Sequence, residues 1–283
     1  MCPRSKHARE LPQHKLLTIN AMPEMKESGE PTQSVPKAHK GVRDLNVKDQ
    51  LPDCEIEIKD FRKLYDIATL SKGSSVVDIG CGFGTLREVV ENAGGKWVGV
   101  EPFEGGKHTV VGDAENLPFD DNLFDVAIMH AVLEHVPNVA KAFTEVSRVL
   151  KPGGVYIGYV SFMESFHEIS YTHMSFKSIE YFANENNMTL EKIASEGGFG
   201  IAHNMGVLLH PIPSRLFQWF INFSLRLLIR IKTTVAYFAL RWGRRKLDKK
   251  EATQSANDYY KLEHLRQATG FRFLIRKNQP PKA

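Results

Sequence analysis

The chain has 283 residues, of which 42% are hydrophobic and 25% charged, and its formal net charge is +4. These values are typical of a globular protein of one or two domains, and the charge is too small to require a nucleic-acid partner. The three cysteines, Cys2, Cys54 and Cys81, are odd in number and irregularly spaced. They form neither a disulfide framework nor a zinc site, so we expect a reducing, cytoplasmic compartment and no metal.

Residues 1–50 mix charged and polar residues with proline and show no apolar periodicity. We therefore expect a mostly disordered N-terminal tail. No apolar segment of signal-peptide length follows the basic start, so a secretory signal is not expected. An organelle transit peptide stays open as an alternative, because the residues before position 24 include four Lys or Arg and a single acidic residue, Glu10.

The chain becomes regular from about residue 56. Helical spacing over 57–70 predicts a first helix, after which apolar strands and amphipathic helices alternate. We expect strands at 75–80, 96–102, 107–113, 123–130, 155–160, 189–198 and 271–277, and helices at 85–92, 139–150 and 175–187. Such alternation predicts a doubly wound α/β fold with a mostly parallel sheet. Its ligand is expected beyond the carboxyl ends of the strands.

A glycine-rich turn, "DIGCGFG", follows the first strand of this series. Gly80, Gly82 and Gly84 are spaced G-x-G-x-G, and glycine lets backbone N–H groups approach a ligand closely. The dinucleotide fingerprint G-x-G-x-x-G would need glycine where Thr85 stands, which argues against NAD. A tight turn without a ligand is the alternative.

Carboxylates stand at the ends of the first three strands of the series. Asp78 lies two residues before Gly80, at the end of an apolar strand, where a carboxylate is costly unless it meets a cation or N–H donors. Glu101 ends the next strand, where a carboxylate can accept hydrogen bonds from ribose hydroxyls. Asp113 ends the third strand, within "GDAENLPF".

Four segments in order, "VVDIGCGFG", "VGVEP", "GDAENLPFDDNLFDVAIMHAVLEHV" and "LKPGGVYIGYV", resemble class I S-adenosylmethionine-dependent methyltransferases. The resemblance is to their small-molecule, type 11-like branch and covers roughly residues 56–200. It implies a doubly wound, mostly parallel, seven-stranded Rossmann-like sheet and S-adenosyl-L-methionine as cofactor. It says little about the methyl acceptor.

The resemblance also implies roles for individual residues. The backbone of the glycine turn would line the methionine part of the cofactor, Glu101 would bind the ribose, and Asp113 the adenine amino group. Only four residues separate Pro102 from Lys107, so the usual helix there is expected to be missing and Phe103 is a candidate to cover the adenine. The cofactor-binding residues are expected to be Asp78, Gly80, Cys81, Gly82, Gly84, Glu101, Pro102, Asp113, Ala114 and His130.

The segment "SFMESFHEISYTHMSF" follows the fifth strand of the series, close to the expected site of methyl transfer. His167 and His173 are our candidates for a catalytic base or for positioning the substrate. The alternative is that they are exposed or hold the loop. Glu134 and His135 in "VLEHV" resemble an acid–base pair, but in this family pattern they begin the next helix.

The acceptor class is narrowed by motifs that the sequence lacks. No Asn/Asp-Pro-Pro-aromatic motif of amino-group methylases follows the fourth strand, and no Pro-Cys pair for cytosine C5 is present. The acidic constellation of metal-dependent catechol-type enzymes is also missing. We therefore expect methyl transfer to O or C of a small, lipophilic molecule, and no nucleic acid as partner.

Residues 207–247 depart from a minimal methyltransferase. They contain eight Lys or Arg and no Asp or Glu, and polar residues recur every three or four positions from Arg215 to Arg244. The remaining positions form a wide apolar face. Arg226, Arg230 and Lys232 interrupt the run, which argues against a transmembrane helix. Three alternatives stay open: a membrane-surface element, a lid or dimerisation helix whose apolar face packs on the core, and a nucleic-acid-binding element.

The expected organisation is a tail (1–50), a cofactor-binding methyltransferase domain (51–200), a helical insertion (201–250), and a C-terminal helix with the last strand returning to the sheet (251–283). We expect a cytoplasmic enzyme, monomeric or homodimeric, with the surface of a membrane as a further candidate partner. The alternative functions are an NAD-dependent oxidoreductase and a catalytically inactive cofactor-binding regulatory or assembly protein.

Overall fold

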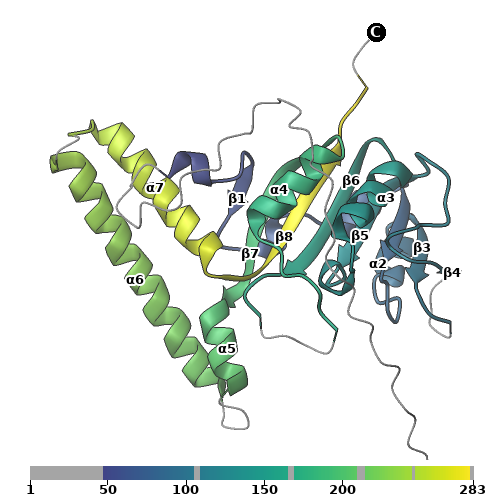
Figure 1. Ribbon diagram of the computed structural model, residues 1–283, viewed down its shortest axis with the longest axis horizontal. Helices are drawn as coiled ribbons and strands as arrows, with labels where there is room; N and C mark the ends of the chain where they lie inside the picture. Colours follow the sequence, from purple (N-terminus) through teal and green to yellow (C-terminus); the bar gives the residue numbers. More distant parts are fainter. Residues whose placement is uncertain (1–46, 105–108, 165–168, 209–213, 244–245, 281–283) are drawn as a thin grey trace, which may run out of the picture. The chain divides into compact units, whose positions relative to one another are not determined.

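The computed structural model describes residues 47–280, apart from 105–108, 165–168, 209–213 and 244–245 (Figure 1). The predicted tail lies almost wholly outside the described residues. Its last residues, Lys48–Gln50, form the short 3-10 helix η1, next to the buried side chain of Val47.

One eight-stranded sheet forms the core of the described residues. Neighbouring strands run parallel except at β8, which pairs antiparallel with β6 and β7. The predicted doubly wound, mostly parallel sheet with an antiparallel last strand is therefore confirmed, and β1 adds an eighth strand at one edge. The order across the sheet is β1 (Glu55–Glu57), β7 (Met188–Phe199), β8 (Ala268–Lys277), β6 (Leu150–Ser161), β5 (Phe124–His130), β2 (Ser75–Ile79), β3 (Lys96–Glu101) and β4 (Val110–Val111).

The helix predicted over 57–70 is wrong. This stretch forms the end of β1, the 3-10 helix η2 (Phe61–Lys63) and the helix α1 (Ile67–Ser71). The side chains of Asp60 and Asp66 accept hydrogen bonds from backbone N–H groups two residues further on, and each begins a new turn. Short acidic side chains thus compete with a continuous helix, despite the helical spacing of the apolar residues.

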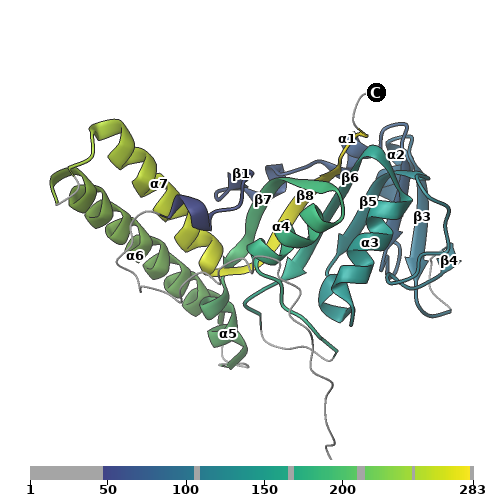
Figure 2. The ribbon, with the colours of Figure 1, turned by 45° about the horizontal axis from the view of Figure 1, so that its top comes forward.

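Helices cover both faces of the sheet (Figure 2). Alternate residues of β2 point to opposite sides, so that Val77 packs in one apolar cluster and Val76 in the other. The first cluster contains residues of α3 (Val139–Val149) and α4 (Phe176–Glu185). In the second, residues of α1 and of α2 (Arg87–Asn92) pack against the sheet. Both helices expected after the fourth and fifth strands are confirmed.

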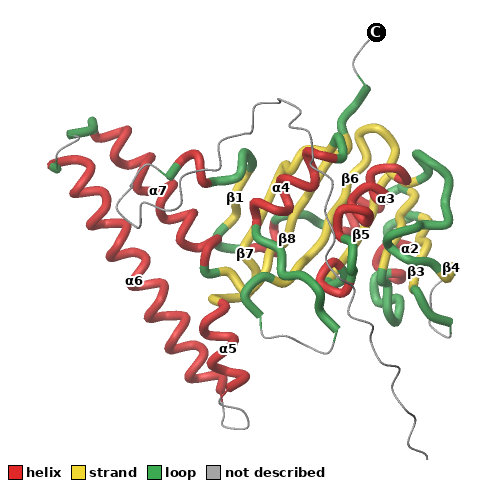
Figure 3. The backbone as a smooth tube through the Cα atoms, viewed as in Figure 1, coloured by secondary structure: helices red, strands yellow, loops and turns green. Residues whose placement is uncertain are grey.

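Along the chain, three helices separate β7 from β8 (Figure 3). The sequence predicted such an excursion before the last strand. The three helices are α5 (Gly200–Leu208), α6 (Ser214–Trp242) and α7 (Lys249–Arg266). The helix before the last strand is longer than expected and begins with a capping box formed by Asp248 and Glu251. It lies beside α6, with Lys232 Nζ 2.5 Å from Glu263 Oε2. Among the described residues, no helix is long and apolar enough to cross a membrane.

Candidate functional site at the carboxyl ends of the strands

The glycine turn after β2 has a left-handed backbone. Gly80, Gly82 and Gly84 have φ angles of +70°, +53° and +67°, which residues with a Cβ rarely adopt. A Cβ on Gly80 would lie 2.4 Å from Cγ2 of Val132, so the turn and the loop after β5 pack too closely for a larger residue. A Cβ on Gly82 would approach only Oε1 of Glu101, at 4.0 Å, so this part of the turn borders open space.

The N–H groups of the turn bind to the protein itself. Those of Gly80 and Cys81 donate to the carbonyl of Val100 at 2.9 and 3.2 Å. The N–H of Gly82 donates to the carboxylate of Glu101, which is buried at the end of β3. A phosphate would need such N–H groups for itself. The turn is therefore poorly suited to a pyrophosphate, whereas Glu101 is held where it can accept hydrogen bonds from hydroxyl groups.

Asp78 lies in β2, and its side chain is only 3% exposed. Burial raises the pKa of this carboxyl group to about 6; a hydrogen bond from Trp97 Nε1, 3.2 Å from Oδ2, opposes the rise, and the charge of Glu101 adds to it. The buried carboxyl is thus partly stabilised by the neighbouring strand, with its other oxygen available for a further donor.

Cys81 is buried in the same turn. Burial, followed by the negative charges of Asp78 and Glu101, raises the pKa of its thiol to about 11. The thiol is therefore protonated at neutral pH, which is the opposite of what an activated nucleophile requires.

The segment after β4 contains the residues expected to bind adenine. Asp113 is exposed, and its Oδ1 accepts the backbone N–H of Glu115 at 2.8 Å, while the neighbouring Ala114 is buried. Pro102 and Phe103 follow Glu101 and are both exposed, the ring of Phe103 to 68%. The exposed ring is available to cover a ligand beside Glu101.

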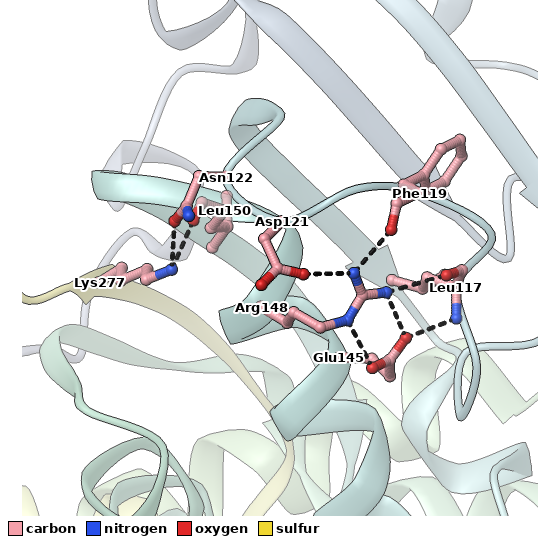
Figure 4. A network of polar contacts seen from close by, with 8 residues as sticks. All are labelled: Leu117, Phe119, Asp121, Asn122, Glu145, Arg148, Leu150 and Lys277. Atoms are coloured by element: carbon pink, nitrogen blue, oxygen red, sulfur yellow. Dashed lines mark hydrogen bonds and ion pairs between the residues drawn. The ribbon is translucent and has the colours of Figure 1, made fainter.

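Arg148 of α3 holds the continuation of this segment (Figure 4). Its guanidinium binds the carboxylate of Glu145, and Oε2 of Glu145 accepts the N–H of Leu117 at 2.7 Å. Glu145 and Arg148 are three residues apart on one helix, and this spacing is the only feature of the sequence that indicates their ion pair. The acceptors of Arg148 in the segment are the carbonyls of Leu117 and Phe119, at 2.9 and 2.6 Å, and Oδ1 of Asp121, at 2.9 Å.

His130 ends β5 beside two residues from other strands. Its ring centroid lies 5.4 Å from that of Tyr159 in β6, and its Nε2 lies 3.3 Å from Nη2 of Arg272 in β8. Removal from water and the positive charge of Arg272 lower the pKa of His130. Arg272 in turn makes two hydrogen bonds of 2.9 Å to Glu196 of β7. Sequence reasoning missed Arg272 and Glu196; a charged residue within the apolar strand "FRFLI" was the available signal.

Residues at the end of β6 and directly after it form a second polar cluster. Tyr159 donates to Oε1 of Glu164 at 2.8 Å, and the hydroxyl of Ser161 lies 2.5 Å from Oε2 of the same residue. Ser161 also lies 3.0 Å from Oε1 of Glu134, which is fully buried. The carbonyl of Glu134 accepts the N–H of Tyr171 at 2.7 Å. These contacts join the loop after β5 to the loop after β6.

The two candidate catalytic histidines differ in what the structure describes. His173 is half-buried, and its Nδ1 lies 3.1 Å from the carbonyl of Phe162, within the same loop. His167 lies outside the described residues. His173 therefore has a contact suited to holding the loop, and its catalytic role stays a prediction.

A cavity of about 350 Å³ lies next to these clusters. It is bordered by the ends of β6 and β7 and by α5 and α6, and Tyr159 connects it to His130. Its polar lining includes Tyr159, Glu164, Glu196, His203, Gln218 and Asn222. The cavity suits a polar group of a small molecule, held between the sheet and the helical insertion.

The order of the strands, the glycine turn and the carboxylate of Glu101 define a class I S-adenosylmethionine-dependent methyltransferase domain. Residues 77–158 match the family model described as a methyltransferase domain. Residues 77–158 thus belong to a methyltransferase domain of this class, and S-adenosyl-L-methionine is its cofactor. The turn bordering open space at Gly82 and the hydroxyl-accepting position of Glu101 both fit this group.

Similar proteins match part of the chain. The sterol 4-C-methyltransferase of Caenorhabditis elegans is 35% identical over 106 residues, 32% of each chain. A demethylmenaquinone methyltransferase of Staphylococcus epidermidis is 38% identical over 104 residues, 31% of this chain and 43% of that protein. A solved S-adenosylmethionine-dependent methyltransferase from Mesorhizobium loti is 14% identical, with 76% of this chain and 95% of that one covered and a TM-score of 0.44. The chain thus spans less than half the length of these two curated relatives.

Proposed function

We propose that the protein transfers a methyl group from S-adenosyl-L-methionine to an oxygen or carbon atom of a small, lipophilic molecule. The observation that carries the proposal is the cavity that meets His130 at Tyr159, beyond the carboxyl ends of β6 and β7, at the same edge of the sheet at which the glycine turn follows β2. In such folds, ligands bind at this edge of the sheet. The bound cofactor would supply an electrophilic methyl group on a sulfonium sulfur.

The residues of the chain have three tasks in this proposal. Glu101 accepts the ribose hydroxyls, and Asp78 with the backbone of Gly80, Cys81 and Gly82 surrounds the methionine part. Asp113 and Ala114 bind the adenine, and His130 lies beside the methionine amino group. Most of the rate acceleration then comes from alignment of the acceptor and exclusion of water, an effect of up to about 7–11 kcal/mol in well-oriented systems.

The acceptor cavity offers hydrogen-bonding groups in addition to space. Burial, together with the hydrogen bond to Glu164, raises the pKa of Tyr159, so its phenol remains a donor at neutral pH. Glu196 is paired with Arg272 and Glu164 with two hydroxyl groups, so both carboxylates are held in place. A base is needed only if the acceptor loses a proton, and His167 and His173 remain our candidates for that step.

A lipophilic acceptor is supported by two further observations. The relatives described above are named for sterols and for demethylmenaquinone, both of which are apolar molecules. In this chain the rings of Tyr159 and Phe199 border the cavity, which gives an apolar acceptor a surface to contact.

An NAD-dependent oxidoreductase is the weaker alternative. Thr85 interrupts the dinucleotide fingerprint, and the N–H groups of Gly80, Cys81 and Gly82 are occupied by Val100 and Glu101. Titration calorimetry with S-adenosyl-L-methionine and with NAD distinguishes the two cofactors. Binding of NAD alone would overturn the proposal.

Turnover separates the enzyme from an inactive cofactor-binding protein. The protein is incubated with methyl-labelled S-adenosyl-L-methionine and a panel of sterols, prenylated quinols and long-chain phenols, and labelled product is extracted into organic solvent. We expect label in at least one of these acceptors and none with Glu101→Ala. Cofactor binding without transfer to any acceptor of the panel would favour the regulatory or assembly protein.

A further inference from the structure

The helix α6 turns its apolar face away from the protein. Its polar residues Gln218 and Asn222 line the cavity, and Oδ1 of Asn222 accepts the N–H of Phe199 at 3.0 Å. Its buried side chains, Ile229, Ala236 and Leu240, lie on the same side of the helix. The large apolar residues of the wide face predicted from the sequence remain exposed instead, so this face does not pack on the core in the described residues, as the expectation of a lid required.

The outer face of α6 carries a continuous row of large apolar side chains. They are spaced three, four or seven residues apart, which places them on one side of the helix. A row of this length is rare on the surface of a protein that has no partner there. The row consists of Leu216, Phe220, Phe223, Leu227, Ile231 and Phe238, each between 45% and 80% exposed.

Aromatic and basic residues border this row. Trp219 and Trp242, near the two ends of the helix, are 64% and 66% exposed, and indole rings favour the boundary between lipid and water. Arg226 and Arg230 are exposed beside the row. The whole segment 207–247 contains eight Lys or Arg and no Asp or Glu.

The basic charge of segment 207–247 favours an anionic membrane over a second copy of the chain as the partner of this face. A second copy of the chain would bring the same basic helix against itself, with no acidic residue within 207–247 to offset the repulsion. A membrane that contains anionic lipids has both an apolar interior for the row and negative headgroups for the arginines. The Lys232 ammonium is already paired with Glu263. Arg215 is exposed next to Leu216, and Arg226 and Arg230 are exposed at a cavity that Tyr260 and His264 also line.

We infer that the outer face of α6, defined by these six apolar residues, docks onto an anionic lipid bilayer. The helix lies in the plane of the bilayer with its apolar row among the acyl chains and its arginines at the headgroups. The inner, polar side of the same helix remains at the cavity. This docking is independent of the methyl transfer proposed above, because it needs neither cofactor nor acceptor.

Vesicle sedimentation with the full-length protein tests the inference. The wild type is expected to sediment with phosphatidylcholine vesicles containing phosphatidylserine, and less with phosphatidylcholine alone. The variant Phe220→Glu/Leu227→Glu/Phe238→Glu is expected to bind the anionic vesicles at least about tenfold more weakly. The matched control Val89→Glu/Leu123→Glu/Tyr181→Glu adds the same charge at exposed apolar positions elsewhere and is expected to bind like the wild type.

Each other outcome overturns the inference. If the wild type ignores both kinds of vesicle, or if the control loses binding as much as the α6 variant, the α6 face is not a membrane-docking surface. A wild type that ignores vesicles and forms a dimer, with an α6 variant that is monomeric in analytical ultracentrifugation, would assign the face to a second copy. Circular dichroism and thermal unfolding of both triple variants exclude loss of the fold as a cause.

Discussion

Arg272 of β8 and Glu196 of β7 lie diagonally across this antiparallel pair of strands and are joined by two hydrogen bonds of 2.9 Å. Such bidentate pairing fixes the plane of the guanidinium as well as its position. Because Nη2 of Arg272 also lies 3.3 Å from Nε2 of His130, this ion pair determines the electrostatic surroundings of the residue at the end of β5.

Replacing Arg272 with methionine should raise the pKa of His130. Burial and the charge of Arg272 lower this pKa, while Glu196 raises it, so the variant loses one lowering cause and leaves the carboxylate unpaired. NMR titration of the imidazole resonances measures the change. The control is Arg276→Met, which removes the equivalent ion pair with Glu191 further along β8. An unchanged or lower pKa in Arg272→Met would contradict the assignment.

The variant Asp78→Asn should be more stable than the wild type at pH 7. The pKa of Asp78 is raised to about 6 in the folded state, so between about pH 4 and pH 6 the unfolded chain loses its proton before the folded one does. The wild type therefore loses stability as the pH rises through this window, by at most about 3 kcal/mol. Asparagine cannot ionise and avoids the loss.

Urea unfolding of both proteins at pH 4 and pH 7.5 checks this prediction. The advantage of Asp78→Asn should be about 1–3 kcal/mol at pH 7.5 and much smaller at pH 4. Its affinity for S-adenosyl-L-methionine should fall at the same time, since the proposed role of Asp78 is to hold polar groups of the cofactor. Equal stabilities of the two proteins at pH 7.5 would show that the carboxylate is not strained by burial.

The variant Gly80→Ala should destabilise the protein by about 1–3 kcal/mol, because it combines a left-handed backbone with a clash against Val132. Adding Val132→Ala should recover part of this loss, since only the backbone strain remains. The control Gly73→Ala has a φ of +69° and no atom within 4 Å of the new Cβ. Thermal unfolding compares all three. No recovery in the double variant would mean that the contact with Val132 does not limit residue 80.

Replacing Arg148 with alanine should weaken cofactor binding although Arg148 touches no predicted cofactor residue. The change removes the donors to Leu117, Phe119 and Asp121 and leaves Glu145 without its cation. We expect a loss of about 1–3 kcal/mol in stability and a several-fold weaker affinity for S-adenosyl-L-methionine by calorimetry.

Two comparisons make the Arg148 prediction specific. Arg148→Lys should recover little, because an ammonium cannot reproduce the fork of hydrogen bonds. Arg62→Ala, which removes an exposed pair with Asp60, should change stability by less than about 1 kcal/mol. If cofactor affinity is equal in Arg148→Ala and Arg62→Ala, the segment after Asp113 does not depend on Arg148.

The variants His167→Ala and His173→Ala should each lower turnover and leave cofactor affinity unchanged, if these residues act on the acceptor. Steady-state kinetics with the acceptor found in the panel, together with calorimetry, separates the two effects. Wild-type turnover in both variants would remove them from the mechanism. For His173, a fall in stability without a change in kcat would indicate that its contact with the carbonyl of Phe162 only holds the loop.

Much of the fold was predictable because its signals are local. Each strand and helix of the βα series has its own run of apolar residues, and the three glycines of the turn lie close together in the sequence. The structure of residues 74–90 can therefore be predicted from this segment alone. The error at 57–70 has the same origin. Helical spacing was present there, but two aspartates that cap new turns, and pairing with the distant strand β7, outweighed it.

The sequence by itself determined the βα order, the left-handed glycine turn and the carboxylate that follows it, because these depend on neighbours along the chain. Only the tertiary structure decided that Arg272, Glu196 and Tyr159 meet beside His130, since they come from four different strands. It also decided which way α6 faces. The amphipathic pattern shows that the helix has two sides, but whether the polar side turns toward a cavity or toward water depends on what the rest of the fold places against it.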